Sequence, residues 1–362
     1  MREMTKRFAA LGALGVALLG STTPSLAGRY RTPTAEQARF YDDLRSGKRP
    51  IARKVLTSAQ RRAVEAPPRT AAVGETSSAV SAAAAPITAG STAVYFSAHP
   101  DDFLLFMNPY RDVVQGDTKA VFVFLTAGDA GLGKGPKSAP YYLARENGAQ
   151  RAIRFMADAA TTTTPDPNSG WVLVAGHAVY RTIYKNTVSY YLRLPDGSGE
   201  GSGYPLHDWA SLIKLKNGEI RSIRAVDGSA TYTSWADLVK TLTTIVKTQA
   251  AGSPNVWLDT HEIDPVASPG DHSDHLATGL AVAAIQPSLP CVNLAHHVGY
   301  ANSGLVNLDL DDIENRAATF ANYASGQAEK GYPGVIWEPT HKSWLAGMVM
   351  RLAPGNGQTC AF

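Results

Sequence analysis

Residues 93–102 read Ala93-Val94-Tyr95-Phe96-Ser97-Ala98-His99-Pro100-Asp101-Asp102. The segment begins as an apolar run of residues that favour β-strands, and it ends abruptly in a histidine and two carboxylates. Because open α/β sheets build their sites where buried strands end, we expect a strand over residues 93–98 with these polar groups at its carboxyl end. Imidazoles and carboxylates at close range are suited to metal binding and to acid/base chemistry.

A second cluster of the same residue types lies far along the chain, in Asp271-His272-Ser273-Asp274-His275. It follows a loop that contains Pro269 and Gly270, and it begins a segment with helical spacing. Both clusters therefore stand at a switch from one predicted element to the next. We expect the two clusters to meet in space around one zinc ion.

The rest of the chain alternates between apolar runs and helical patterns, which is typical of an α/β sheet. Strands are expected over residues 93–98, 119–126, 171–174, 255–259 and 292–298, and helices over residues 141–159, 234–246, 275–283 and 308–327. Residues 180–232 differ, because they alternate in polarity and carry a turn signal at 195–197 and a hairpin signal at 216–218. The expected fold is α/β, a Rossmann-like three-layer sandwich with a mostly parallel sheet and a β-rich insertion around residues 180–232.

The N-terminus has the layout of a secretory signal peptide. Arg2, Lys6 and Arg7 form a basic segment, residues 8–19 are apolar, and Ser25 and Ala27 place small residues before a cut after position 27. The apolar run is shorter than the ~18 residues of a membrane span. We therefore expect loss of residues 1–27, a secreted or extracytoplasmic protein, and no stable membrane anchor. A buried first helix is the alternative for this segment.

Composition indicates a globular protein without a nucleic-acid partner. Of 362 residues, 44% are hydrophobic, which is enough for a full core. Lys and Arg number 34 against 31 Asp and Glu, and loss of residues 1–27 would leave 31 against 30. A balance this close to neutral gives no reason to expect binding to nucleic acid.

Residues 28–90 are expected to form a basic extension followed by an Ala/Ser/Thr-rich linker, and residues 91–362 to form the domain that holds both clusters. The basic part is interpreted either as an arm for an anionic polymer or as a solvated extension lying on the domain. The domain contains two cysteines, Cys291 and Cys360, and neither belongs to a Cys-x-x-Cys pair. In an oxidising compartment this pair suggests one disulfide that ties down the C-terminal tail, with two buried free thiols as the alternative.

The two clusters supply the residue types of a catalytic zinc site, which usually has three protein ligands and one open position. His99 and Asp102 lie three residues apart across a sharp turn and can aim at one point, and His275 can supply the third ligand. Asp101 is left over. A free carboxylate in that place is a natural general base for the water that zinc activates.

His272 is also left over, close to the predicted helix start. A protonated imidazole there can stabilise an oxyanion or protonate a leaving amine, and Asp274 can orient it. Taken singly each motif is weak, because a His-x-x-His pair, or two aspartates after a strand, often has only a structural role. The joint occurrence of both clusters favours a metal site.

Both motifs resemble those of the PIG-L (LmbE-like) zinc-dependent N-acetylglucosaminyl deacetylases. The family pattern is Ala-His-Pro-Asp-Asp with a distal His-x-Asp-His, and residues 98–102 and 272–275 have this form. The similarity extends to residues 125–129, 145–146 and 276–279, so it covers roughly residues 90–300. The resemblance implies three zinc ligands, a general base and an electrophile, which are His99, Asp102, His275, Asp101 and His272 in that order.

The resemblance also implies that Arg145 and Asp129 lie near the substrate. The implied reaction is hydrolysis of the N-acetyl group of an acetamido sugar, and export favours a glycan or glycoconjugate as the substrate. This chain departs from the family at two positions. Phe103 stands where a Glu often follows the two aspartates, and Gly148 stands where an Arg-x-x-Glu pattern has its Glu. The partner carboxylate of Arg145 is therefore expected to be Glu146 or a distant residue.

Two other classes of function stay open at this point. A metal-dependent phosphoesterase would use the same residue types, but it usually needs two metals and more carboxylates. A secreted glycan-binding protein with a non-catalytic metal site is the second, and the intact Asp101 and His272 argue against it. A dinucleotide-binding domain is not favoured, because no Gly-x-Gly-x-x-Gly follows the first strand.

Overall fold

The computed structural model describes residues 90–115, 118–133, 139–160, 163–332 and 339–360. The expected signal peptide at residues 1–27, and the extension and linker up to residue 89, lie outside the described residues. Within the described part of the chain, no helix combines the length and the apolar character that crossing a bilayer requires.

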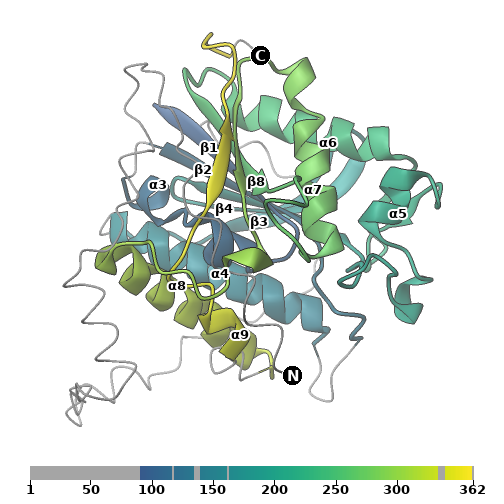
Figure 1. Cartoon of the computed structure of the whole chain (residues 1–362), viewed down its shortest axis with the longest axis horizontal. Coiled ribbons are helices and arrows are strands. Elements are labelled where there is room, and N and C mark those ends of the chain that lie inside the picture. Colours follow the sequence, from purple (N-terminus) through teal and green to yellow (C-terminus); the bar gives the residue numbers. More distant parts are fainter. Residues whose placement is uncertain (1–89, 116–117, 134–138, 161–162, 333–338, 361–362) are drawn as a thin grey trace, which may run out of the picture. The chain divides into compact units, whose positions relative to one another are not determined.

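Eight strands form one sheet, in the order β10-β9-β8-β1-β2-β5-β4-β3 (Figure 1). Their bounds are β1 Ser91–Ser97, β2 Thr118–Thr126, β3 Asn168–Val174, β4 His177–Tyr184, β5 Thr187–Leu194, β8 Val256–His261, β9 Asn293–His297 and β10 Met350–Ala353. The neighbours from β9 to β5 pair in parallel, and antiparallel pairing adds β10 at one edge and the β4–β3 pair at the other. The structure thus confirms the expected α/β fold with a mostly parallel sheet.

Helices cover both faces of this sheet. One face carries α4 (Tyr141–Ala160), α8 (Leu310–Glu329) and the short α3 (Tyr110–Gln115), and the other carries α6 (Trp235–Ala250) and α7 (Ser273–Ala283). The helices α4 and α8 run side by side in the lower part of Figure 1, and α6 and α7 lie together on the opposite side. These are the three layers that the sequence predicts.

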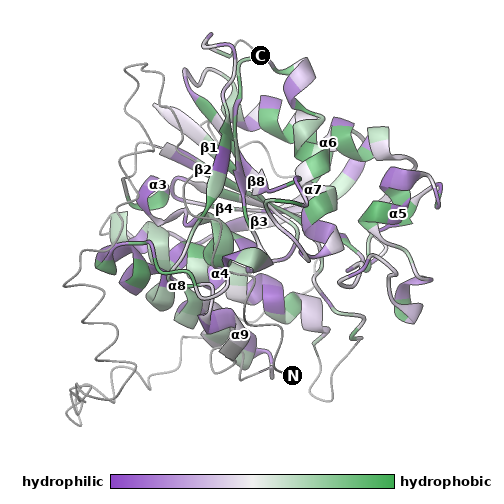
Figure 2. Cartoon of the chain, in the orientation of Figure 1, coloured by the Kyte–Doolittle hydropathy of each residue, from purple (hydrophilic) through white to green (hydrophobic). Residues whose placement is uncertain are grey.

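The side chains of β1 are divided between the two faces. Val94 and Phe96 pack in the core formed with α6 and α7, whereas Ala93 and Tyr95 pack in the core formed with α4 and α8. A strand that is covered on both faces carries a nearly continuous apolar run, which is what the sequence shows here. In Figure 2 hydrophobic and hydrophilic residues alternate along α4 and α8, as expected for helices with one buried face.

The β-rich insertion is smaller than the sequence suggests. Within residues 180–232, β4 and β5 belong to the main sheet, and only β6 (Ile223–Arg224) and β7 (Thr231–Tyr232) form a separate two-stranded sheet. The segment before β6 contains η3 (Pro205–His207) and α5 (Leu212–Asn217). The hairpin expected at residues 216–218 is wrong, because Gly218, with a φ of 75°, ends α5 in a left-handed cap.

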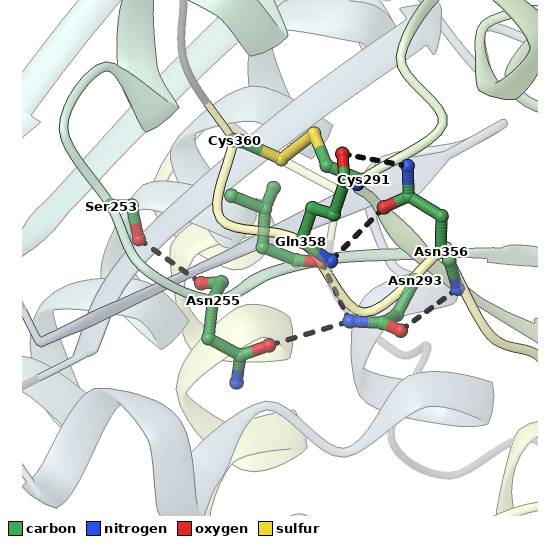
Figure 3. The surroundings of a disulfide bond; sticks show 9 residues. Ser253, Asn255, Cys291, Asn293, Asn356, Gln358 and Cys360 are labelled. Carbon is green, nitrogen blue, oxygen red and sulfur yellow. Dashed lines mark hydrogen bonds between the residues drawn. A yellow bond between two sulfur atoms is a disulfide. The ribbon is translucent and has the colours of Figure 1, made fainter.

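A disulfide joins Cys291 to Cys360, with the two Cα atoms 5.3 Å apart, and confirms the bond expected from the cysteine pair (Figure 3). Hydrogen bonds of the Asn293 side chain lie near it (Figure 3). Asn293 Nδ2 donates a hydrogen bond to Asn255 Oδ1 at 3.3 Å, and Gly355 N donates to Asn293 Oδ1 at 3.0 Å. The C-terminal tail is thereby tied to the segment that leads into β9.

The strand order determines where a site can form. The strand β1 has β2 on one side and β8 on the other, so the direction in which the sheet grows reverses beside β1. In open α/β sheets, ligand sites lie at the carboxyl ends of the strands beside such a reversal. The ends of β1, β5, β8 and β9 are therefore the places to look for polar side chains.

Candidate metal centre

The carboxyl ends of the parallel strands bring the two sequence clusters together. The turn after β1 supplies His99, Asp101 and Asp102, and the start of α7 supplies His272 and His275. All of these side chains are buried except that of His272, which is 11% exposed. Burying so many polar groups is unfavourable unless they are paired with each other or with a bound ion.

Atoms of three of these residues lie at the separations that a tetrahedral zinc ion requires. His99 Nδ1 lies 3.3 Å from His275 Nε2 and 3.4 Å from Asp102 Oδ2, and His275 Nε2 lies 3.3 Å from Asp102 Oδ1. Zinc with bonds of about 2.0–2.2 Å holds its ligand atoms roughly 3.3–3.6 Å apart. The two imidazoles face different oxygens of Asp102, and one ligand atom from each of the three residues lies within 4.8 Å of the others. The three residues predicted as ligands therefore form a buried His/Asp group that could bind a metal.

Each imidazole of this group has a carboxylate at its other ring nitrogen. Asp271 Oδ1 lies 2.7 Å from His275 Nδ1, and Asp274 Oδ2 lies 3.4 Å from His99 Nε2. His99 Nε2 is buried and has no hydrogen-bond partner among the described residues. Histidines that bind metals usually present the second ring nitrogen to a carboxylate or carbonyl, which fixes the orientation of the ring. The surroundings of both imidazoles thus fit a metal-binding role.

The pocket favours positive charge. Burial lowers the pKa of a histidine, yet the carboxylates of Asp102 and Asp271 outweigh burial and raise the pKa of His275 to about 9. In the same way burial is outweighed at His99, where Asp102 and Asp274 raise the pKa well above its ordinary value. A divalent cation would supply this charge in place of the two protons. The donor set, its spacing and its electrostatics agree on a cation.

His272 is held at the start of α7 by a backbone hydrogen bond. The Asp274 N–H donates to His272 Nδ1 at 3.1 Å, so His272 caps the helix through that nitrogen. Because a backbone amide can only donate, Nδ1 is the acceptor and the ring proton lies on Nε2. Burial and the nearby His99 and His275 rings lower the pKa of His272 to about 3, so the ring is neutral.

This differs from the protonated His272 that we expected the Asp274 carboxylate to orient. The carboxylate of Asp274 accepts a hydrogen bond from Gly197 N at 2.8 Å, and its Oδ2 lies 3.4 Å from His99 Nε2 and 3.8 Å from His272 Nδ1. The hydrogen bond to His272 Nδ1 comes from the backbone of Asp274, and the carboxylate of the same residue lies close to this nitrogen. The site therefore gains a neutral N–H donor at His272 Nε2.

Asp101 lies outside the three-residue ligand group, and its carboxylate is bound by Arg145. The Arg145 guanidinium donates hydrogen bonds from Nη2 to Asp101 Oδ1, from Nη1 to the Gly128 carbonyl at 2.7 Å and from Nε to the Tyr323 hydroxyl at 3.0 Å. Burial lowers the pKa of Arg145, but the Asp101 carboxylate outweighs burial and raises it well above its ordinary value. Arg145 therefore stays charged and fixes one oxygen of Asp101.

Of the two partners expected for Arg145, Glu146 or a distant residue, the structure shows the distant one, Asp101. Glu146 accepts two hydrogen bonds from Arg193, at 2.7 and 2.8 Å. The residue that completes the Arg145 contacts is Tyr323 of α8, and Gly148 lets α8 come close enough. A Cβ atom at position 148 would lie 2.7 Å from the Tyr323 carbonyl oxygen. Gly148 thus accounts for the departure from the Arg-x-x-Glu pattern.

Asp129 lies on the same side of the site as Arg145. Its turn also contains Gly128, whose carbonyl accepts from Arg145. The Asp129 side chain is buried, with Oδ2 2.5 Å from His207 Nε2 and Oδ1 accepting from the Asp196 N–H at 3.4 Å. Asp129 therefore joins the turn after β2 to the loops that follow β5. A substrate contact by Asp129 or Arg145 stays a prediction.

Asp196 belongs to the site, although its sequence context predicted only a turn. Its Oδ2 lies 3.9 Å from His99 Nε2, and its Oδ1 lies 3.9 Å from His272 Nε2. The signal was present, since Asp196 follows the end of a strand just as Asp101 does. A Pro-Asp-Gly sequence is equally typical of a surface turn, and the turn interpretation concealed the carboxylate.

His261 is a second residue whose place the sequence left open. It ends β8, its Nε2 lies 3.1 Å from Asp102 Oδ2, and its ring stacks on that of His275 with centroids 4.0 Å apart. Burial and the neighbouring His275 lower the pKa of His261 to about 4, against the opposing effect of Asp102. His261 is thus a neutral, fully buried support for two of the three converging residues.

Among known proteins, only solved structures of low sequence identity are similar to this chain. No family model matches this chain, and no curated protein matches it at a significant level. Among solved structures the chain is similar to N,N'-diacetylchitobiose deacetylase from Pyrococcus horikoshii, with a TM-score of 0.43 and 13% identity, over 73% of this chain and 84% of that one.

Two further solved structures have the same degree of similarity. One is a deacetylase from the biosynthesis pathway of teicoplanin, with a TM-score of 0.39 and 14% identity, over 66% of this chain and 85% of that one. The other is GalB, the 4-carboxy-2-hydroxymuconate hydratase from Pseudomonas putida, with a TM-score of 0.36 and 10% identity, over 73% and 96%. Similarity at this level carries over no reaction or residue role, so function has to be argued from this chain's own residues.

Proposed function

We propose that this chain is a metal-dependent hydrolase that removes the N-acetyl group from an acetamido sugar or glycan. The observation that supports it best is the convergence of His99, Asp102 and His275 at zinc-ligand separations, with a fourth residue, Asp101, outside the ligand group. Three ligands beside a carboxylate that is not itself a ligand are what a hydrolytic metal site needs. Zinc bound there would polarise the acetyl carbonyl and activate a water molecule.

Asp101 is the proposed general base. Arg145 binds its Oδ1, which leaves Oδ2 to take a proton from the attacking water. The water oxygen bonds to the acetyl carbon, the C–N bond breaks, and Asp101 returns the proton to the leaving nitrogen. Acetate and a free amine are released, and the carboxylate is restored for the next cycle.

His272 is the proposed donor to the oxyanion that forms on the acetyl carbon. Its Nδ1 is occupied by the Asp274 N–H, so the group that can point at substrate is the neutral Nε2–H. A preorganised neutral donor stabilises developing negative charge without itself being consumed. Return of the proton to the amine is therefore assigned to Asp101.

A glycan or glycoconjugate outside the cytoplasm is the proposed substrate. The motifs at residues 98–102 and 272–275 resemble those of deacetylases that act on acetamido sugars, and the layout of residues 1–27 resembles a secretory signal peptide. The Cys291–Cys360 disulfide is consistent with an oxidising compartment. Zinc is the proposed metal because its preferred ligand types and spacing match the site.

The test combines metal analysis with two product assays on the same protein. Zinc-loaded protein is incubated with N-acetylglucosamine and its oligomers while acetate is measured, and with p-nitrophenyl phosphate while phosphate is measured. We expect acetate, no phosphate, and one zinc per chain. Asp101→Asn should keep its zinc and lose kcat by about 10²- to 10⁴-fold.

Each other outcome points to a named alternative. Phosphate without acetate would indicate a phosphoesterase, and tight glycan binding without product would indicate a binding protein. Full activity of Asp101→Asn, with zinc retained, would remove Asp101 as the base while leaving the metal site standing.

A further inference from the structure

His341 reaches the site from the C-terminal segment, and no sequence pattern assigns it a role. It lies in the short helix α9 (Pro339–Lys342). Its Nε2 lies 3.8 Å from Oδ2 of Asp101, which is the oxygen opposite to the one that Arg145 binds. Two basic side chains from distant parts of the chain thus face the two oxygens of the proposed base.

Aromatic contacts hold the His341 ring in this place. The ring stacks on Phe320 of α8, with centroids 5.7 Å apart and planes inclined by 23°, and it meets Trp344 edge-on at 5.9 Å. Trp344 in turn stacks on Tyr300, which follows β9, at 5.0 Å. The ring is therefore packed between α8 and the wall of the site, and its side chain is only 20% exposed.

The backbone next to His341 is anchored as well. Arg316 of α8 is buried, and its NH1 donates to three carbonyls at 3.2, 3.4 and 2.8 Å, those of Trp344, Leu345 and Gly347. The same helix supplies Tyr323 to Arg145. Arg145 and His341, the two side chains that face Asp101, are thus both held by contacts with α8. The same rigid helix therefore fixes the distance between them.

We propose that His341 is a positioning residue for Asp101, an inference that rests on the proposed function. A carboxylate bound at one oxygen can still swing about that contact, and a second polar group at the other oxygen fixes its plane. The separation of 3.8 Å is longer than a hydrogen bond. Contacts between catalytic groups are often long before substrate binds and tighten in the complex. When the contact tightens in the substrate complex, it holds Oδ2 towards the attacking water.

The experiment separates the polar atom of His341 from its packing. His341→Phe keeps an aromatic ring on Phe320 and removes the nitrogen, whereas His341→Gln keeps an N–H group at a similar reach. We expect the Phe variant to lose kcat by about 10- to 100-fold with KM within twofold, because misplacement of a reacting group acts on turnover. The Gln variant should recover most of the loss, and both should keep wild-type zinc content.

The matched control is His177→Phe. His177 also pairs with an aspartate, Asp237, at 2.9 Å, but it lies on β4 near the far edge of the sheet. We expect His177→Phe to keep wild-type kcat. If His341→Phe fails to fold, His341→Asn takes its place, since that side chain is too short to reach Oδ2.

Two results would overturn the role of His341 and leave the proposed function standing. One is a wild-type kcat in His341→Phe while Asp101→Asn is inactive, and the other is equal loss in the Phe and Gln variants, which would reduce His341 to packing. Failure of the proposed function has a different signature. Wild-type protein would then release no acetate, or Asp101→Asn would be fully active, and a residue that positions Asp101 would lose its role with it.

Discussion

At the scale of single residues, His272 serves two purposes through its two ring nitrogens. Nδ1 accepts the Asp274 N–H and caps α7, and Nε2 carries the proton that faces the site. One side chain thus contributes both to the stability of a helix and to the proposed stabilisation of an oxyanion. The two contributions can be separated, because other side chains can cap a helix without presenting an N–H group at the same place.

His272→Asn should separate them. Asparagine is a good helix cap, so we expect its free energy of unfolding to stay within about 0.5 kcal/mol of wild type, whereas His272→Ala should lose about 1 kcal/mol. Both variants should lose kcat by about 10²- to 10³-fold, because both lack the Nε2–H donor. Denaturant unfolding and acetate release measure the two effects. Wild-type turnover in the Asn variant would contradict the donor role, and unchanged stability in the Ala variant would contradict the cap.

Asp271 is expected to act on metal affinity through His275. Its Oδ1 lies 2.7 Å from His275 Nδ1 and also accepts from His272 N at 2.9 Å and Tyr300 N at 3.2 Å. Asp271→Asn keeps the shape and removes the charge, so the zinc Kd should weaken by about 10- to 100-fold. Competition for zinc with a chelator measures this Kd.

The control for Asp271→Asn is Asp264→Asn. Asp264 lies in the same loop between β8 and α7, but it is exposed, and its Oδ1 accepts a hydrogen bond from Val266 N of that loop at 2.9 Å. Its zinc Kd should match that of wild type. A similar weakening in both variants would mean that loop charge in general, and not the contact with His275, sets the affinity.

Single residues also show how far the sequence can be used. His99, Asp102 and His275 could be selected because each stands where a strand or a helix changes character. Asp196 also follows the end of a strand, but its Pro-Asp-Gly sequence indicated a turn, and no local signal marked His341. Asp196 faces His99 only because β5 pairs with β2 and opens at the same edge of the sheet, and His341 depends on how the C-terminal segment packs on α8. Long-range pairing and packing leave no mark in a local pattern.

At the scale of elements, α4 and α8 approach each other through two glycines. A Cβ atom at Gly326 would lie 2.7 Å from Gly148 Cα, and one at Gly148 would lie 2.7 Å from the Tyr323 carbonyl oxygen. The two backbones are therefore close enough to exclude any side chain. This approach brings the Tyr323 hydroxyl to Arg145, so helix packing and the geometry of the proposed base are linked.

Gly148→Ala should disturb both the packing of α4 on α8 and the contact between Tyr323 and Arg145. An added methyl group at a tight contact costs about 1–3 kcal/mol of stability, and displacement of Tyr323 should lower kcat by about tenfold. Thermal unfolding and acetate release give the two readings. Gly170→Ala on β3 is the control, since a Cβ atom there meets nothing within 4 Å and its stability should change by less than about 0.5 kcal/mol. Equal stability of the two variants would contradict the close approach of α4 and α8.

Elements with local signals were predictable, and those decided by distant contacts were not. The helix α6 begins where Ser234 and Asp237 indicate, and the Ser234 hydroxyl accepts the Asp237 N–H at 3.1 Å. The Asn217-Gly218 pair was misassigned to a hairpin because a left-handed glycine ends helices as readily as it turns hairpins. Only the packing of α5 settles which of the two forms.

At the scale of the whole molecule, the disulfide and the metal centre lie at opposite ends of the parallel strands. Cys291 precedes β9, at the amino end of that strand, and β10 runs antiparallel to β9 and returns Cys360 to the same end. The converging His/Asp group lies beyond the carboxyl ends. Loss of the disulfide is therefore separated from the His/Asp group by the whole length of the strands.

Cys291→Ser/Cys360→Ser tests this separation. The bond links positions 69 residues apart, and loss of a cross-link over such a loop should cost about 2–4 kcal/mol of stability, mainly because the unfolded chain regains freedom. Zinc content and kcat at 25 °C should stay at wild-type values, since the strands that carry the site keep their pairing. Wild-type protein treated with a reductant is the matched control and should behave like the double variant. The contrary result is loss of zinc from the reduced protein at a temperature where the oxidised and reduced forms are both folded. It would show that the tail supports the carboxyl ends of β8 and β9, and that the two ends of the sheet are coupled.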